Sequence, residues 1–71
     1  MKRAFKLENL DCAHCAAKME DAIGKIDGVD SANIAFMTQR LTIETEDDME
    51  RILDEAQKRI SVIEPDCRIK R

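Results

Sequence analysis

The spacing of apolar residues changes several times along the 71-residue chain, and the order of these changes restricts the fold more than any other feature. Apolar and polar residues alternate over residues 3–8, 31–36, 40–44 and 67–70, which is typical of strands with one buried face. Apolar residues recur at helical spacing over residues 16–26 and 49–60, which is typical of amphipathic helices. The predicted order is therefore strand, helix, strand, strand, helix, strand.

This order predicts an α+β domain, a ferredoxin-like βαββαβ sandwich in which a four-stranded antiparallel sheet carries both helices on one face. Two separate cores would each bury too little apolar surface, so we expect residues 1–71 to form one domain. In this topology the loop after the first strand lies near the start of the last. We therefore expect residues 11–15 to lie within reach of residues 65–67.

Local residues predict where the helices begin and end. The first helix is expected to begin near Ala13 and to end before the turn residues Asp27 and Gly28. The second is expected to begin at Asp47, because Asp47 and Glu50 have the spacing of a capping box.

Composition excludes several classes of function. The formal charge is −3, both signs are dispersed, and Tyr and Trp are absent, so we expect no binding of nucleic acid. No stretch approaches the ~20 apolar residues of a membrane span, and residues 7–11 are too polar for a signal peptide. We expect a cytoplasmic chain without direct membrane contact. Its odd count of three cysteines fits reduced thiols better than disulfides.

Cys12 and Cys15 have the Cys-x-x-Cys spacing that lets a loop entering a helix direct two sulfur atoms at one metal ion. Cys15 falls in the first helical turn, where the helix dipole and free N–H groups stabilise a thiolate. Because metals bind deprotonated sulfur, this placement favours metal binding at neutral pH. The sequence therefore predicts a site for a soft metal ion.

Asp11 is predicted to select which metal binds. Two thiolates alone suit Cu(I), whereas Zn(II) and Cd(II) need about four ligands. A carboxylate from Asp11 would leave less uncompensated negative charge around a divalent ion than around Cu(I). We therefore expect Zn(II), Cd(II) or Pb(II), with Cu(I) as the alternative. A compatible second role for Asp11 is capping of the following helix.

Other residues have simpler interpretations. We expect His14 to face solvent and Cys67 to be a small core residue, with metal ligation as the alternative for each. Met19, Met37 and Met49 are expected on apolar faces or in a turn, rather than in a methionine-rich copper site. The acidic residues 44–50 lack the spacing of a calcium loop and are expected to be a solvated turn and helix start.

Residues 10–16, Leu-Asp-Cys-Ala-His-Cys-Ala, together with Lys18, Glu20 and the Ile-Asp-Gly-Val of residues 26–29, resemble the heavy-metal-associated domain. This family occurs in copper chaperones and at the cytosolic N-terminus of metal-transporting P-type ATPases. The resemblance covers residues 3–70. Copper members usually have Met-Thr before the first cysteine. The Leu10-Asp11 found here is similar to the Zn(II)/Cd(II)/Pb(II) branch of those ATPases.

The resemblance implies that Cys12 and Cys15 supply the metal thiols and that Asp11 supplies the extra carboxylate. Copper members often have Gly-Tyr, Gly-Phe or a lysine before the last strand, where residues 63–66 here are Ile-Glu-Pro-Asp. This departure leaves Glu64, Asp66 and Cys67 open as supplementary ligands.

The resemblance also implies a role in metal delivery. Such a domain acquires the ion in the cytosol and passes it to, or regulates, the membrane-embedded part of a P-type ATPase, or exchanges it with another metal-binding domain. The chain has no nucleotide site or phosphorylated-Asp motif, so we expect a non-enzymatic monomer that is either freestanding or excised from a longer ATPase.

Three alternatives remain from the residues alone. The first is a Cu(I) chaperone on the same fold. The second is a dithiol redox module, although the predicted element order is not that of thioredoxin and no Trp precedes the cysteine pair. The third is a structural domain, or one that binds a ligand on its exposed sheet face, because this fold hosts many functions.

Overall fold

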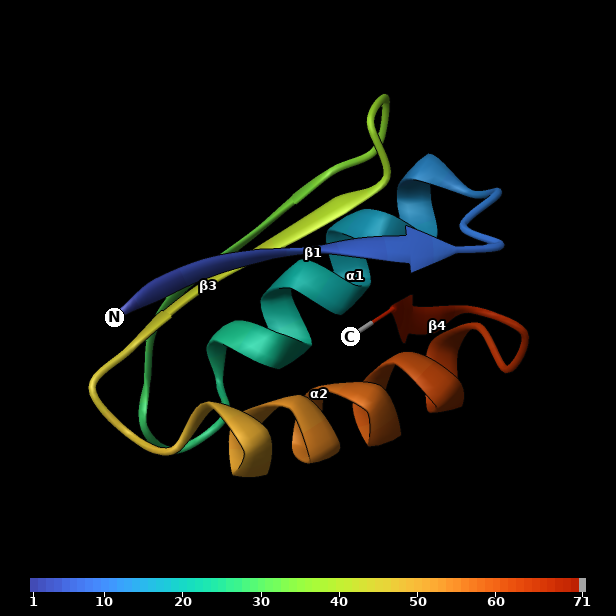
Figure 1. Ribbon diagram of the computed structural model, residues 1–71. Helices are drawn as coiled ribbons and strands as arrows, with labels where there is room; N and C mark the ends of the chain where they lie inside the picture. The colour runs from blue at the N-terminus through green and yellow to red at the C-terminus, as the bar shows by residue number, and fades with distance from the viewer. Residues whose placement is uncertain (71) are drawn as a thin grey trace.

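The computed structural model describes residues 1–70, and it confirms the predicted βαββαβ order. Figure 1 shows the two helices on one side of the sheet. The elements are β1 (Lys2–Glu8), α1 (Ala13–Gly24), β2 (Val29–Ala35), β3 (Arg40–Thr45), α2 (Met49–Ile63) and β4 (Arg68–Lys70). Neither helix within residues 1–70 has the length and apolar character needed to cross a membrane.

The sheet is antiparallel, with the strand order β2-β3-β1-β4. Its inward side chains follow the predicted alternation, since Phe5 lies opposite Leu41 and Leu7 lies opposite Ile69. The apolar stripe of α2 is buried against this face as predicted, and it consists of Met49, Ile52, Leu53, Ala56 and Ile60. Burying a side chain of the size of Leu or Ile stabilises a fold by about 1.5–3 kcal/mol, so this layer dominates the stability.

Several predicted boundaries are wrong by one or two residues, among them the start of α2 and both ends of β2. The N-cap of α2 is Asp48, whose Oδ1 accepts a hydrogen bond from the Glu50 N–H at 3.2 Å. Asp47 instead accepts from the Asp48 N–H and pairs with Arg51, and these two contacts lower the pKa of its carboxyl. β2 begins at Val29 because a bulge extends its pairing with β3, and Phe36 lies in the turn that follows.

Side chains cover both edges of the sheet. At the β2 edge, the Ile34 N–H donates to Glu20 Oε2 at 2.7 Å. At the β4 edge, Gln57 Oε1 accepts from the Ile69 N–H at 2.8 Å, while Gln57 Nε2 donates to the Cys67 carbonyl at 3.1 Å. Unpaired strand edges invite pairing with other chains, so these contacts both satisfy the backbone and block such pairing. They also attach β4, which has only three residues, to α2.

We expect Gln57→Leu to lower the free energy of unfolding by about 1–3 kcal/mol, because it leaves partly buried backbone groups of β4 without partners. Urea unfolding followed by far-UV circular dichroism measures this difference. The neighbouring Lys58 is exposed, so Lys58→Ala is the control and should leave the stability almost unchanged. Equal stabilities of the two variants would contradict the role given to Gln57.

Candidate metal site

The loop between β1 and α1 is fixed at Asn9 and Leu10. Leu10 is fully buried in the core. Asn9 adopts a left-handed conformation with φ 62°, which Asn tolerates better than most residues, and its Nδ2 donates to the Asp66 carbonyl at 3.1 Å. This contact confirms that the loop lies beside the segment before β4. Two segments far apart in the sequence therefore meet at one end of the sheet, as Figure 1 shows.

Gln39 holds the same loop from the other side. This residue lies in the turn between β2 and β3 and also has a left-handed backbone, with φ 52°. Its carbonyl accepts from the Leu7 N–H at 2.7 Å, and its Nε2 donates to the Leu10 carbonyl at 2.8 Å. The β2–β3 turn therefore determines where the backbone before Cys12 lies. The sequence analysis missed this role, because a Gln in a short polar connection shows no sign of it.

Cys12 and Cys15 are brought together at the N-terminus of α1. Cys12 is the N-cap residue, and its Sγ accepts a hydrogen bond from the Cys15 N–H at 3.2 Å. Both side chains are half-buried, so the pair is open to solvent on one side. Asp11 is exposed and does not occupy the N-cap position. The capping role considered for Asp11 is therefore wrong, because Cys12 fills it.

The two thiols differ in acidity. The pKa of Cys12 is lowered because the Cys15 thiol donates a hydrogen bond to its sulfur, and because the backbone N–H groups of Cys15 and His14 do the same. The pKa of Cys15 is raised, since its proton is held in that bond and its sulfur loses solvent. The predicted stabilised thiolate at Cys15 is therefore wrong. Free N–H groups at a helix N-terminus point back toward the N-cap residue, which here is Cys12.

Acidic residues surround the pair without completing a ligand set. The charge of Glu64, the half-buried residue that caps the C-terminus of α2, contributes to the raised pKa of Cys15 and Cys67. At Cys12 the hydrogen bonds from Cys15 and His14 outweigh the same charge, so the pKa is lowered. Asp11 acts on the pKa of Cys67 instead. Within residues 1–70, no three His, Cys, Asp or Glu side chains are gathered in a geometry that could hold a metal ion.

His14 and Cys67, the alternative metal ligands, lie where they were expected as a solvent-facing residue and a core residue. His14 is exposed on the first turn of α1, and Cys67 is fully buried in the core. Burial also raises the pKa of the Cys67 thiol, so this sulfur is protonated and shielded at neutral pH. Of the seven predicted or alternative ligands, Cys12 and Cys15 are joined by a hydrogen bond. Within residues 1–70, no third His, Cys, Asp or Glu side chain completes a metal-binding group with them.

A ferredoxin-like sandwich with an accessible dithiol at a helix N-terminus is the arrangement of a small metal-binding domain. The profile of the heavy-metal-associated domain matches residues 4–62. The chain belongs to this family, as the residues around Cys12 and Cys15 predicted.

Relatives of the chain include both zinc-type and copper-type proteins. A zinc/cadmium/lead-transporting P-type ATPase of Escherichia coli is 30% identical over 53 residues, which is 75% of this chain and 7% of that protein. The copper chaperone CopZ of Enterococcus hirae is 30% identical over 43 residues, 61% of this chain and 62% of that protein. The apo N-terminal domain of ZntA superposes with a TM-score of 0.75 at 24% identity, covering 99% of this chain and 92% of that one.

We expect iodoacetamide near neutral pH to modify Cys12 before Cys15, and Cys67 last. The lowered pKa of Cys12 gives it the largest thiolate fraction, the raised pKa of Cys15 gives it less, and Cys67 is buried. Peptide mass spectrometry at successive times measures the three rates, and raising the pH should narrow the difference between Cys12 and Cys15. In urea all three should react alike. Faster modification of Cys15 in the folded protein would contradict this assignment.

We expect Gln39→Asn to weaken metal binding about three- to tenfold, the equivalent of one lost hydrogen bond. Asn retains the tolerance for a left-handed backbone, but its shorter side chain cannot reach the Leu10 carbonyl. Titration of the reduced protein with Cd(II), followed by thiolate-to-metal absorbance against a competing chelator, measures this effect. Met37 in the same turn is 93% exposed, so Met37→Ala is the matched control. An unchanged affinity for Gln39→Asn would show that the contact does not position the loop.

Proposed function

We propose that this domain binds a soft divalent ion, Zn(II), Cd(II) or Pb(II), through Cys12, Cys15 and the carboxylate of Asp11. We further propose that it delivers the ion to a metal-transporting P-type ATPase, or regulates that pump. The observation that carries this proposal is the accessible pair of thiols at the N-terminus of α1, one of which has a lowered pKa. Metal binding consumes deprotonated sulfur, so a thiol that ionises readily favours capture at neutral pH.

The charges around the thiols support a divalent ion. Glu64 acts electrostatically on both Cys12 and Cys15, and Asp11 directly precedes the pair. Lys18 offsets part of this field at Cys15. Two thiolates and one carboxylate carry three negative charges. A divalent ion leaves one of these charges uncompensated, whereas Cu(I) leaves two. The Escherichia coli relative is a transporter of zinc, cadmium and lead by name, which agrees with this choice.

Delivery is consistent with the accessibility of the loop. Cys12 and Cys15 are half-buried, so the thiolates of a second protein can replace them one at a time. The contacts of Asn9, Leu10 and Gln39 hold the loop in place during such an exchange. The chain spans 7% of the length of the ATPase that it resembles. We propose the membrane-embedded part of such an ATPase, or another metal-binding domain, as the partner of a monomeric, non-enzymatic and cytoplasmic domain.

A second candidate function is Cu(I) delivery. It is favoured by the CopZ relative and by the absence, within residues 1–70, of a gathered third ligand, because two sulfur atoms satisfy Cu(I). The two functions differ in what the carboxylates do, since a carboxylate is a ligand for the divalent ions and an unfavourable neighbour for Cu(I).

Competition titrations of the reduced protein with Zn(II), Cd(II), Pb(II) and Cu(I) separate these functions. We expect Asp11→Asn to weaken the divalent ions by about tenfold or more, and to leave Cu(I) unchanged or improved. Glu64→Gln is the matched variant, because it removes the carboxylate whose charge reaches both thiols without altering the residue next to Cys12.

The outcomes are distinct. A loss for Asp11→Asn alone supports Asp11 as the ligand, and a loss for Glu64→Gln alone transfers that role to Glu64 while retaining the divalent ion. If neither variant weakens a divalent ion and both leave Cu(I) tightly bound, the proposal is wrong and Cu(I) delivery takes its place. Cys12→Ser should abolish binding of every ion in all cases.

A further inference from the structure

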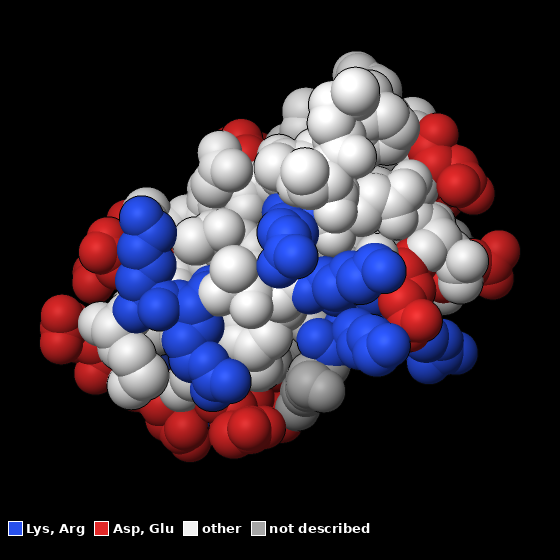
Figure 2. All heavy atoms as spheres, turned by 45° about the horizontal axis from the view of Figure 1, so that its top comes forward, with Lys and Arg blue, Asp and Glu red and all other residues white. Residues whose placement is uncertain are grey.

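The open face of the sheet, opposite the helices, carries a row of three cations. Lys6 on β1 lies directly opposite Arg40 on β3 and directly opposite Lys70 on β4. All three are exposed and alternate with the buried residues of their strands, so they point away from the helices. Figure 2 shows blue side chains gathered on this side of the molecule, although the chain as a whole has a charge of −3. We call Arg40, Lys6 and Lys70 the cationic row.

Folding does not account for the cationic row. Like charges directly opposite each other on a sheet are destabilising. The neighbouring rows avoid this arrangement, because Lys2 lies opposite Glu44 and Arg68 lies opposite Glu8. Within residues 1–70, the ion pairs join the N-terminus to Glu46, Lys25 to Asp21 and Arg51 to Asp47, and none of them includes the row. Its positive charge is therefore available to a ligand.

The form of this face limits what the ligand is. Small side chains flank the row, namely Ala4 on β1, Ala35 on β2 and Thr42 on β3. These side chains are too short to block access to the cations. Neither Phe lies on it, since Phe5 is buried and Phe36 is in a turn, and it therefore offers no ring on which a nucleic-acid base could stack. No pocket for a small molecule is present within residues 1–70.

Spacing and net charge favour a polypeptide over a broad anionic surface. The row crosses two strand spacings, so its outer cations are about 10 Å apart. Carboxylates on alternate residues of an extended segment are about 7 Å apart, so their side chains can reach the cations of the row. The flanking charged rows each contain an acidic residue, Glu44 and Glu8, whereas this row contains none. A membrane or a nucleic acid would also meet the negative charge of the rest of the domain.

We propose that the cationic row binds an acidic segment of a partner polypeptide. The row lies at the end of the sheet that carries the candidate metal loop, since Arg40 follows Gln39, whose side chain holds Leu10. A partner bound there would lie beside Cys12 and Cys15 without occupying them. This inference goes beyond the proposed function, because the contact is formed by charges outside the site and requires no metal.

A fluorescein-labelled peptide of alternating Glu and Ser residues is the probe, with fluorescence anisotropy of the reduced, metal-free domain at low ionic strength as the readout. We expect Lys6→Gln/Lys70→Gln to weaken binding by about tenfold or more. The matched control is Lys25→Gln/Lys58→Gln, which removes the same charge from the C-cap of α1 and from α2, and it should change binding little. Raising the salt concentration should weaken binding to the wild type. Amide shifts in β1, β3 and β4 should locate the peptide on the sheet.

The proposal is overturned if both double variants lose binding equally, because the interaction would then reflect net charge alone. It is also overturned if vesicles containing phosphatidylserine, or single-stranded DNA, bind through Lys6 and Lys70 while the peptide does not. Loss of fold would not explain the expected result, since removing opposed like charges should keep the melting temperature at or above that of the wild type. Failure here leaves the metal titrations unaffected, because the probe is used without metal.

Discussion

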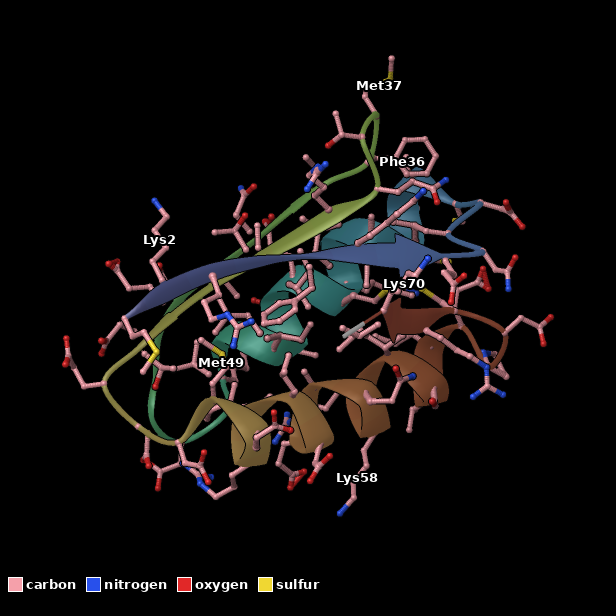
Figure 3. All side chains as sticks on the ribbon, in the orientation of Figure 1. Lys2, Phe36, Met37, Met49, Lys58 and Lys70 are labelled. Carbon is pink, nitrogen blue, oxygen red and sulfur yellow. The ribbon has the colours of Figure 1, made fainter. Side chains whose placement is uncertain are left out.

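The structure depends on one aliphatic layer between a single face of the sheet and the two helices. The inward side chains of β1 and β3 meet the buried stripe of α2 and the buried residues of α1. Phe5 is the buried aromatic residue of this layer, and the partly buried Phe36 packs against it. Because this layer is on one side only, the other face of the sheet and its two ends remain free. The candidate metal loop occupies one of those ends, and the cationic row lies on the free face beside it. Figure 3 labels Lys70 of this row on β4.

The candidate site is a rigid support for a reactive pair. Leu10 anchors the loop in the core, and Asn9 and Gln39 attach it to the segments on either side. The N–H groups at the start of α1 then stabilise the thiolate of Cys12, while Cys15 donates its proton to the same sulfur. Contacts outside the dithiol therefore set its position, and hydrogen bonds at the start of α1 have the largest effect on its acidity.

The sequence predicted the fold closely because its periodicities are local. Residues such as Leu41 and Ile43 alternate in a way that only a half-buried strand satisfies, and the stripe from Met49 to Ile60 has helical spacing. Boundaries were less certain, as the shift of the N-cap from Asp47 to Asp48 shows. Two adjacent acids can each cap a helix, and the ion pair with Arg51 engages the first of them.

By itself, the sequence determined the element order, the core and the pair Cys12 and Cys15, because each follows from residue spacing within one segment. The tertiary structure alone decided which thiol is the more acidic, since that depends on the direction of N–H groups in space. It also brought Gln39 to the loop and aligned Arg40, Lys6 and Lys70 across three strands. These residues are dispersed along the chain, and only the pairing register of the strands makes them neighbours.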